Sequence, residues 1–365
     1  MTNLDIAHRR LHNQLITQQM FEKPGDVVQW LGAVQAQDYA AAKWAIGLRL
    51  QGATSDDIEQ AVADGAILRT HVMRPTWHFV APADIRWLLA LTAPRVHAAS
   101  AYYYHTLGLD DAIFTRSNAA LAKALQGGKQ LTRLELVSVL KQVGIVTENL
   151  GFLYLIMHAE LDGIVCSGAR RGKQFTYALL EERVLQTRTL DHDEALAEFA
   201  MRYFTSHGPA TLQDFVWWSG LTMADARTGL AMVTSELMHE VVDDQTYWFV
   251  ASAPLAPSTK ELSQTAYLLP NFDEYTVGYK DRGAVIDASH TEKFDSRGSV
   301  LNNVLVLDGQ VVGTWRRTLK KDVVIITPNL FIPLTTAESC AFAAAANRYG
   351  AFLGKAVHTT WKQGL

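Results

Sequence analysis

Apolar residues recur about every three or four positions along most of the first two thirds of the chain, the spacing of amphipathic helices. The pattern predicts helices over residues 6–21, 26–31, 40–50 and 55–64. Residues 66–72 and 76–80 are instead β-prone and flank Met73-Arg74-Pro75, so we expect two strands joined by a short connection. Helices followed by a two-stranded ribbon are the order of a winged helix.

The same order recurs twice. The second round comprises predicted helices over 118–126, 133–143 and 150–161 and strands over 163–166 and 174–178. The third comprises predicted helices over 193–206, 211–218 and 223–237 and strands over 240–242 and 246–250. These rounds predict tandem winged helices. Because no strict sequence repeat is visible, three unrelated α/β pieces are the alternative.

The last third of the chain is mainly strand-like. Residues 251–258, with two prolines, predict a linker. Strands are predicted over 266–269, 277–279, 304–307, 311–315 and 323–327, with a hairpin at Asp308-Gly309 and a closing helix over 336–353. The predicted fold class is therefore α+β, mainly α. It has three tandem winged-helix domains (1–97, 98–190 and 191–258) and a C-terminal β-rich, barrel-like element (259–365).

Composition narrows the class of protein. An apolar fraction of 48% and a charged fraction of 19% are those of a soluble globular protein. The net charge of −4 means that any nucleic-acid binding must come from a local patch. Cys166 and Cys340 lie too far apart in sequence for a disulfide framework or a zinc motif. With neither a signal peptide nor an apolar run of about 18 residues, we expect a cytoplasmic protein without a membrane partner.

Candidate chemistry begins with Gln35 and Gln37, which stand in an otherwise apolar run. An unpaired buried amide costs about 1–3 kcal/mol, so two such amides indicate either a site that grips a polar group or caps of a helix end or turn. Asp38 competes with Gln37, because neighbouring side chains on a helix diverge by about 100°. Asp273 and Glu274 are further carboxylate candidates, unless they form a turn that hydrogen-bonds its own backbone.

Basic residues cluster on the predicted ribbons, where they could contact phosphates. The candidates are Arg74 with His78, Arg170 with Arg171 and Lys173, and Arg316 with Arg317, Lys320 and Lys321. Solvated loops are the alternative for the exposed clusters. The spacing of His71 and His78 does not indicate a metal site, and no motif calls for a cofactor.

Four segments resemble a known family: residues 32–38 (GAVQAQD), 69–78 (RTHVMRPTWH), 269–275 (LPNFDEY) and 313–317 (GTWRR). Together they make the chain similar, over nearly its whole length, to winged-helix DNA glycosylases of the AlkZ/YcaQ type. The resemblance implies a C-shaped monomer around a channel for double-stranded DNA. It implies removal of alkylated purines, especially N7-alkylguanine, and action on interstrand cross-links. The Gln-x-Gln signature of one branch implies that Gln35 and Gln37 are catalytic.

Glutamine cannot accept a proton at neutral pH, so these residues are poor general bases. A purine alkylated at N7 already carries positive charge and leaves without protonation. What remains is to orient water and to stabilise the oxocarbenium-like sugar, which fixed amide dipoles can do. We therefore expect selectivity for cationic lesions. A non-catalytic DNA-binding regulator and a protein-interaction scaffold are the competing hypotheses.

Overall fold

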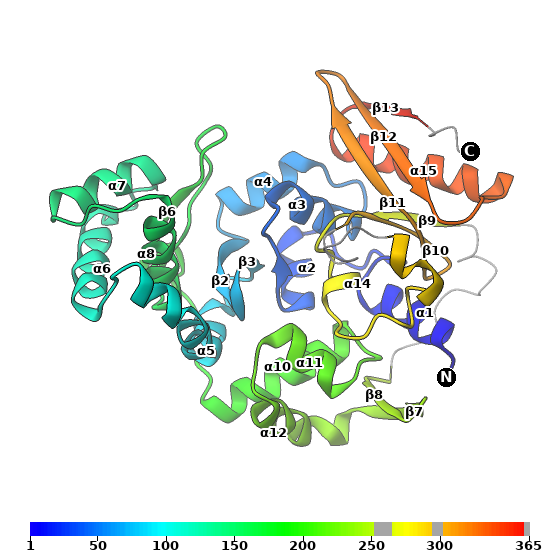
Figure 1. Cartoon of the computed structure of the whole chain (residues 1–365), viewed down its shortest axis with the longest axis horizontal. Helices are drawn as coiled ribbons and strands as arrows, with labels where there is room; N and C mark the ends of the chain where they lie inside the picture. The colour runs from blue at the N-terminus through cyan, green and yellow to red at the C-terminus, as the bar shows by residue number, and fades with distance from the viewer. Residues whose placement is uncertain (252–264, 294–301, 361–365) are drawn as a thin grey trace.

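Helices followed by an antiparallel ribbon occur three times in the computed structural model, which describes residues 1–251, 265–293 and 302–360 (Figure 1). In the first round the strands form a three-stranded sheet in the order β1-β3-β2. Its elements are α1 (Asn3–Asn13), α2 (Pro24–Leu31), β1 (Val34–Gln35), α3 (Tyr39–Leu48), α4 (Ser55–Ala63), β2 (Leu68–Val72) and β3 (Arg74–Val80).

The second round follows a long helix, α5 (Ile85–Thr106), and its strands form a sheet in the order β4-β6-β5. Its elements are α6 (Asp111–Leu125), β4 (Leu131–Thr132), α7 (Arg133–Gln142), α8 (Asn149–Leu161), β5 (Val165–Ser167), β6 (Thr176–Leu179) and α9 (Leu180–Arg183). The third round comprises α10 (His192–Ser206), α11 (Leu212–Ser219), α12 (Met223–Val233), η1 (Thr234–Glu236), β7 (Met238–Val242) and β8 (Gln245–Phe249). The assignment of each round to a winged helix stays a prediction.

The C-terminal region forms a curled five-stranded sheet in the order β13-β12-β11-β10-β9, with one helix, α15, against it. Only β12 and β13 pair in parallel among these strands. The elements are β9 (Ala266–Leu269), α14 (Glu274–Val277), η2 (Ala288–Lys293), β10 (Val304–Leu307), β11 (Gln310–Leu319), β12 (Val323–Leu330), α15 (Thr336–Phe352) and β13 (Ala356–Thr359). The β-rich element expected here is therefore present. The predicted linker over 251–258 lies, apart from residue 251, outside the described residues.

Local signals explain why many elements begin and end where they do. Among the described helices, six start with a capping box, with the cap residues Thr2, Thr54, Thr132, Asp191, Thr211 and Thr335. The Asp308-Gly309 hairpin is confirmed: both residues have positive φ, 47° and 76°, as a two-residue turn of this kind requires.

Several predicted elements were wrong. The first helix ends at Asn13 instead of residue 21, and Leu15 has a left-handed φ of 63° that breaks it. The strand expected over 277–279 is absent, because a short helix, α14, ends at Val277. Helix α5 and strand β13 were not predicted.

The apolar core links the two ends of the chain. Helices α1 to α4 share one buried cluster with the C-terminal sheet and α15. Within it the indole of Trp44 on α3 donates a hydrogen bond to the Leu268 carbonyl oxygen at 2.7 Å. The indole of Trp315 donates to the neighbouring Leu269 carbonyl at 2.9 Å. The first helices and the last sheet therefore stabilise each other.

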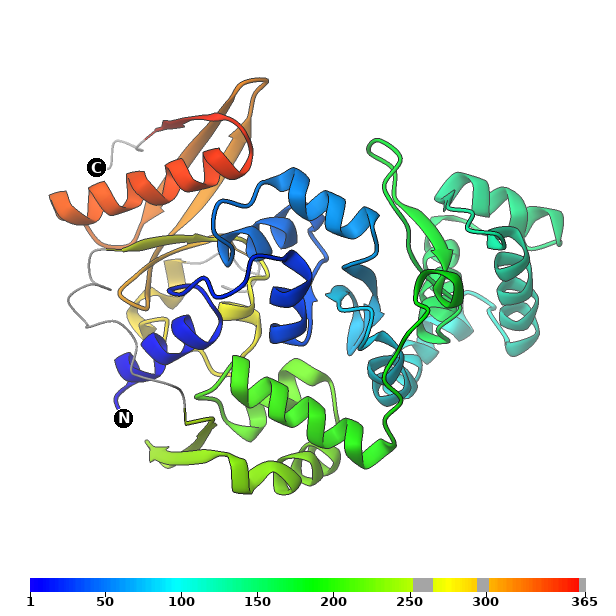
Figure 2. The same ribbon diagram turned by 180° about the vertical axis from the view of Figure 1, so that it is seen from behind.

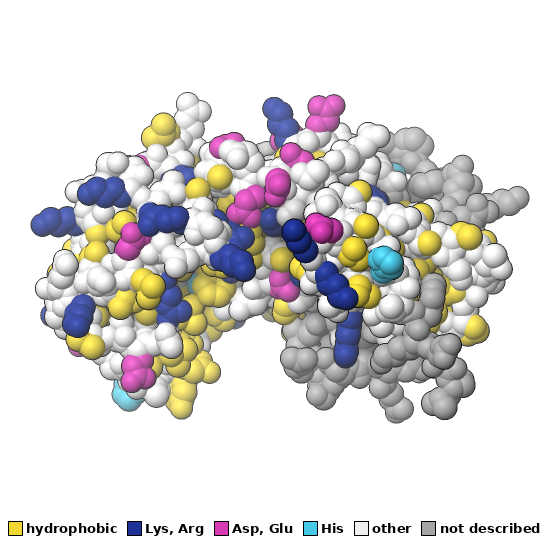
Figure 3. Space-filling model, turned by 90° about the horizontal axis from the view of Figure 1, so that it is seen from above, with side chains coloured by type: hydrophobic (Ala, Val, Ile, Leu, Met, Phe, Trp, Pro, Cys, Tyr) yellow, Lys and Arg dark blue, Asp and Glu magenta, His cyan; other side chains and the backbone are white. Residues whose placement is uncertain are grey.

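The second round forms a lobe with its own apolar cluster, joined to the rest through α5 and through contacts of α8 and β5 with β2 (Figure 1, and from behind in Figure 2). Figure 3 shows a recess in the outline between this lobe and the remainder, with Lys and Arg side chains on the lobe and across the middle of the face. None of the helices in the described part of the chain has the length and apolarity that a membrane crossing requires.

Candidate active site

The Gln-x-Gln motif lies at the end of a strand and in the bend that follows it, not on a helix. Gln35 ends β1 and stands opposite His78 of β3, and the pairing continues as the Ala36 amide donates to the Trp77 carbonyl at 2.7 Å. Gln35 is 9% exposed and Gln37 is exposed.

Two hydrogen bonds fix Gln35. Its backbone N–H donates to Oε1 of Glu274 at 3.0 Å, and its side-chain Oε1 accepts from Nη2 of Arg74 at 3.2 Å. Arg74 is itself held by donating to the Trp217 carbonyl at 3.3 Å. The carboxamide is thus oriented by a side chain and not consumed by neighbouring main chain.

Glu274, the first residue of α14, lies behind this amide and is 1% exposed. Its Oε2 accepts from the Trp218 indole at 2.8 Å and lies 3.4 Å from Nε2 of His207. Burial alone would raise the pKa of Glu274. The hydrogen bonds from His207 and the Gln35 amide, with the positive charge of Arg74, outweigh burial and hold that pKa below its ordinary value. The carboxylate is therefore ionised.

The other two carboxylate candidates serve as helix caps. Asp273 accepts from the Tyr275 amide at 3.0 Å, and its two oxygens bind the Arg49 guanidinium at 2.9 Å each. Asp38 accepts from the Ala41 amide at 3.0 Å at the start of α3. The turn interpretation therefore fits Asp273, whereas its neighbour Glu274 supports the Gln35 strand.

A small cavity of about 210 Å³ opens beside Gln35. It is lined by residues from four separate segments of the chain: Gln35, Arg74, Thr76, Trp217, Phe272 and Val277. Thr76 Oγ1 is buried there and has no hydrogen-bond partner among the described residues. A concave site with an unpaired polar atom and an anchored amide is suited to bind a polar group.

His78 is buried below the exposed surface, at 1% exposure. Its Nδ1 lies 3.0 Å from the Thr76 carbonyl, and its Nε2 finds no partner in the described part of the chain. Burial, together with the nearby charge of Arg74, lowers the pKa of His78 to about 3, so the ring is neutral. His71 pairs with Glu160 instead of approaching His78.

Two aromatic residues of the site escaped a sequence-based assignment. Trp217 is 45% exposed while its neighbour Trp218 is buried, and only the fold separates the two. Phe272 is half-buried with a φ of 60°, an uncommon conformation for a bulky residue. No spacing rule connects these positions with Gln35. The sequence signals available were the adjacent pair Trp217-Trp218 and the place of Phe272 in segment 269–275, which carries the family resemblance.

The second basic cluster lies on the loop between β5 and β6, beside α4 (Figure 1). Arg170 stands over the Tyr39 ring, 5.0 Å from its centroid, and pairs with Glu59 at 3.5 Å. Arg171 binds both oxygens of Glu135, at 2.9 and 3.1 Å. Lys173 is exposed. The two arginines therefore position the loop, and the lysine is presented to solvent.

The third basic cluster lies on β11 and its turn to β12. Arg316 is exposed, whereas Arg317 donates to the Tyr349 hydroxyl of α15 at 2.7 Å. Lys320 and Lys321 are exposed at the turn. Because side chains alternate along a strand, Arg317 packs against α15 while Arg316 points to solvent, where it could contact a polyanion.

Comparisons with known proteins agree over nearly the whole chain. The sequence model of a family described as DNA glycosylase AlkZ-like matches residues 28–352. A curated protein of Streptomyces sahachiroi named interstrand DNA cross-link repair glycosylase is 26% identical over 335 residues, 87% of this chain and 88% of that protein. The solved structure titled Streptomyces sahachiroi DNA glycosylase AlkZ matches with a TM-score of 0.80 at 21% identity, covering 99% of this chain and 100% of that one.

Proposed function

The chain belongs to the AlkZ-like DNA glycosylase family, and from this premise we propose that it hydrolyses the N-glycosidic bond of cationic N7-alkylated purines in double-stranded DNA. We assign Gln35 and Gln37 to orienting water and stabilising the oxocarbenium-like sugar. The observation that carries the proposal is the anchored carboxamide of Gln35, which lines a small cavity and has Arg74 bound to its oxygen.

The chemistry suits an amide. The bond between C1′ and N9 breaks, and its electron pair leaves with the purine and neutralises the positive charge on the base. Water bonds to C1′ and gives its excess proton to solvent. No protein base is needed at the moment of cleavage. Fixed dipoles at the correct place can orient the water and stabilise the positive charge that develops on the sugar.

Glu274 acts as a positioning residue in this scheme. It does not line the cavity, and its oxygens are taken by the Gln35 amide, the Trp218 indole and His207. Its negative charge is buried and accepts a hydrogen bond from the Gln35 backbone. That charge holds the strand in place and favours a cation developing near it.

The name of the Streptomyces relative points to interstrand cross-links, and we extend that substrate to this chain. A cavity of about 210 Å³ is smaller than the about 300–1,000 Å³ of typical ligand pockets. A lesion attacked at the duplex surface, without entry into an enclosing pocket, leaves room for a second strand attached to the base.

Release of N7-methylguanine from duplex DNA tests the proposal, with abasic sites converted to breaks by alkali. Wild type should release the base, and Gln35→Ala and Gln37→Ala should each lower the single-turnover rate by about 10²–10³-fold. Gln51→Ala, an exposed glutamine outside the site, is the matched control and should retain the rate. Equal release by wild type and both site variants would contradict the assignment. DNA binding without release would favour a non-catalytic binder.

A further inference from the structure

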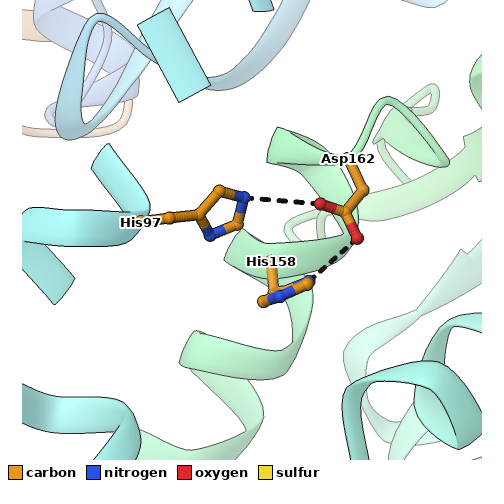
Figure 4. Close-up of side chains that lie close together, drawn as sticks. All are labelled: His97, His158 and Asp162. Carbon is orange, nitrogen blue, oxygen red and sulfur yellow. Dashed lines mark ion pairs between the residues drawn. The ribbon is translucent and has the colours of Figure 1, made fainter. Parts of the chain in front are cut away.

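Helices α5 and α8 bring three potential metal ligands together outside the candidate active site (Figure 4). His97 comes from α5, His158 from the last turn of α8, and Asp162 from the position that ends α8. Nε2 of His97 lies 3.3 Å from Oδ1 of Asp162, and Nδ1 of His158 lies 3.0 Å from Oδ2. All three ligand atoms are within 4.8 Å of one another.

The contact between His158 and Asp162 is not an ordinary hydrogen bond. Although the two atoms are 3.0 Å apart, the buried Nδ1 of His158 makes no hydrogen bond within the described part of the chain. A nitrogen and a carboxylate oxygen that converge in this way are arranged as two ligands of one cation. Their spacing of four residues on a helix places both side chains on one face.

Surrounding groups hold two of the three side chains, His97 and Asp162, as an outer shell would. Nδ1 of His97 lies 3.0 Å from the Tyr104 hydroxyl, which leaves Nε2 directed at Asp162. Asn118 donates to Oδ2 of Asp162 at 2.8 Å, and its buried Oδ1 has no partner among the described residues. Ligating histidines commonly bind a second group through the other ring nitrogen. A cavity of about 390 Å³, lined in part by His97 and Asp162, gives access from solvent.

We propose that His97, His158 and Asp162 bind one divalent transition-metal ion of the zinc class, with water completing the coordination. Two imidazoles and one carboxylate are a ligand set suited to zinc and its neighbours, and unsuited to Mg²⁺ or Ca²⁺, which prefer oxygen. The ion joins α5 to α8 and so fastens the lobe of the second helical round to the rest of the molecule. The site is independent of the glycosylase assignment.

Zinc binding to the full chain tests the site. Protein freed of metal is titrated with Zn²⁺ against a chromophoric chelator, and Co²⁺ is followed by its visible absorption. One equivalent should bind, and His97→Gln and Asp162→Asn should abolish that binding. His105→Ala, which removes an exposed histidine of the same helix, should leave it unchanged.

A milder variant keeps the proposal testable if the ligand variants fail to fold. Tyr104→Phe removes only the hydroxyl next to His97 and should weaken Zn²⁺ binding about tenfold without removing a ligand. Circular dichroism checks the fold of each variant. Absence of stoichiometric binding to wild type, or binding that persists unchanged in folded His97→Gln and Tyr104→Phe, would overturn the proposal.

Discussion

At the scale of single residues, the site depends on how one amide is held. The Gln35 carboxamide is bound by Arg74, and the Gln35 backbone by the buried carboxylate of Glu274. Such anchoring leaves little freedom to rotate, so the dipole needs no rearrangement when charge develops on the sugar. The neutral His78 opposite Gln35 in the sheet adds no positive charge at that point.

His78 predicts a pH dependence of stability. Its pKa is about 3 when folded and 6.5 in the unfolded chain, so below pH 6.5 the unfolded chain takes up a proton and the folded protein does not. Stability that is present above pH 6.5 is therefore lost as the pH falls toward about 3, at about 1.4 kcal/mol per pH unit. Urea unfolding of wild type and His78→Phe between about pH 7 and pH 5 checks this. The variant should show the shallower slope, and equal slopes would refute the assignment.

At the scale of elements, the short helix α14 and the loops of two ribbons position most of the residues to which we assign a function. Helix α14 delivers Glu274 to β1, and the buried ion pair of Arg49 with Asp273 holds its first turn. The ribbon loops differ in role along their length, since Arg170 and Arg171 hold one loop in place while Lys173 faces solvent.

Removing Arg49 should unfold this arrangement. Arg49→Met leaves the Asp273 carboxylate buried without its partner, and we expect the free energy of unfolding to fall by about 3–5 kcal/mol. Adding Asp273→Asn removes the uncompensated charge and should recover part of the loss. Denaturant unfolding of the single and double variants measures both effects. A double variant less stable than Arg49→Met would show that the charge is not the cause.

Lys173 should act as a phosphate contact. Lys173→Ala should weaken binding to duplex DNA of any sequence and lower the slope of log K against log salt by about 0.9. Lys141→Ala, an exposed lysine on α7, serves as control. Fluorescence anisotropy at several salt concentrations gives the slopes. An unchanged slope in Lys173→Ala would show that Lys173 makes no phosphate contact and that this loop only packs against the protein.

At the scale of the whole molecule, the chain closes on itself, because its first helices and its last sheet share one core. A fragment ending at residue 251 loses the Leu268 carbonyl that binds Trp44, and it exposes the apolar face that α15 covers. We expect this fragment to lack cooperative thermal unfolding. Differential scanning calorimetry of the fragment and of the full chain tests this expectation. A native-like transition in the fragment would show that the N-terminal part of the core is stable without the C-terminal sheet.

Sequence reasoning succeeded where local signals dominate and failed where distant contacts decide. Cap residues and the Asp308-Gly309 turn act within a few positions, so the elements beside them were predictable. A strand was predicted over 277–279, but α14 extends to Val277, because Asp273 caps this helix and binds Arg49 far away in the chain. Gln35 and Glu274 were both candidates, yet their contact across 239 residues is a property of the fold.

The central claim is that rigid amides complete a cleavage that positive charge on the base has already begun. Single-turnover release from duplex DNA carrying either N7-methylguanine or its neutral analogue 7-methyl-7-deazaguanine tests it most directly, because both bases have the same methyl group at the same place. The wild-type protein should bind both duplexes and release only the cationic base. Comparable release of the neutral analogue would contradict the account.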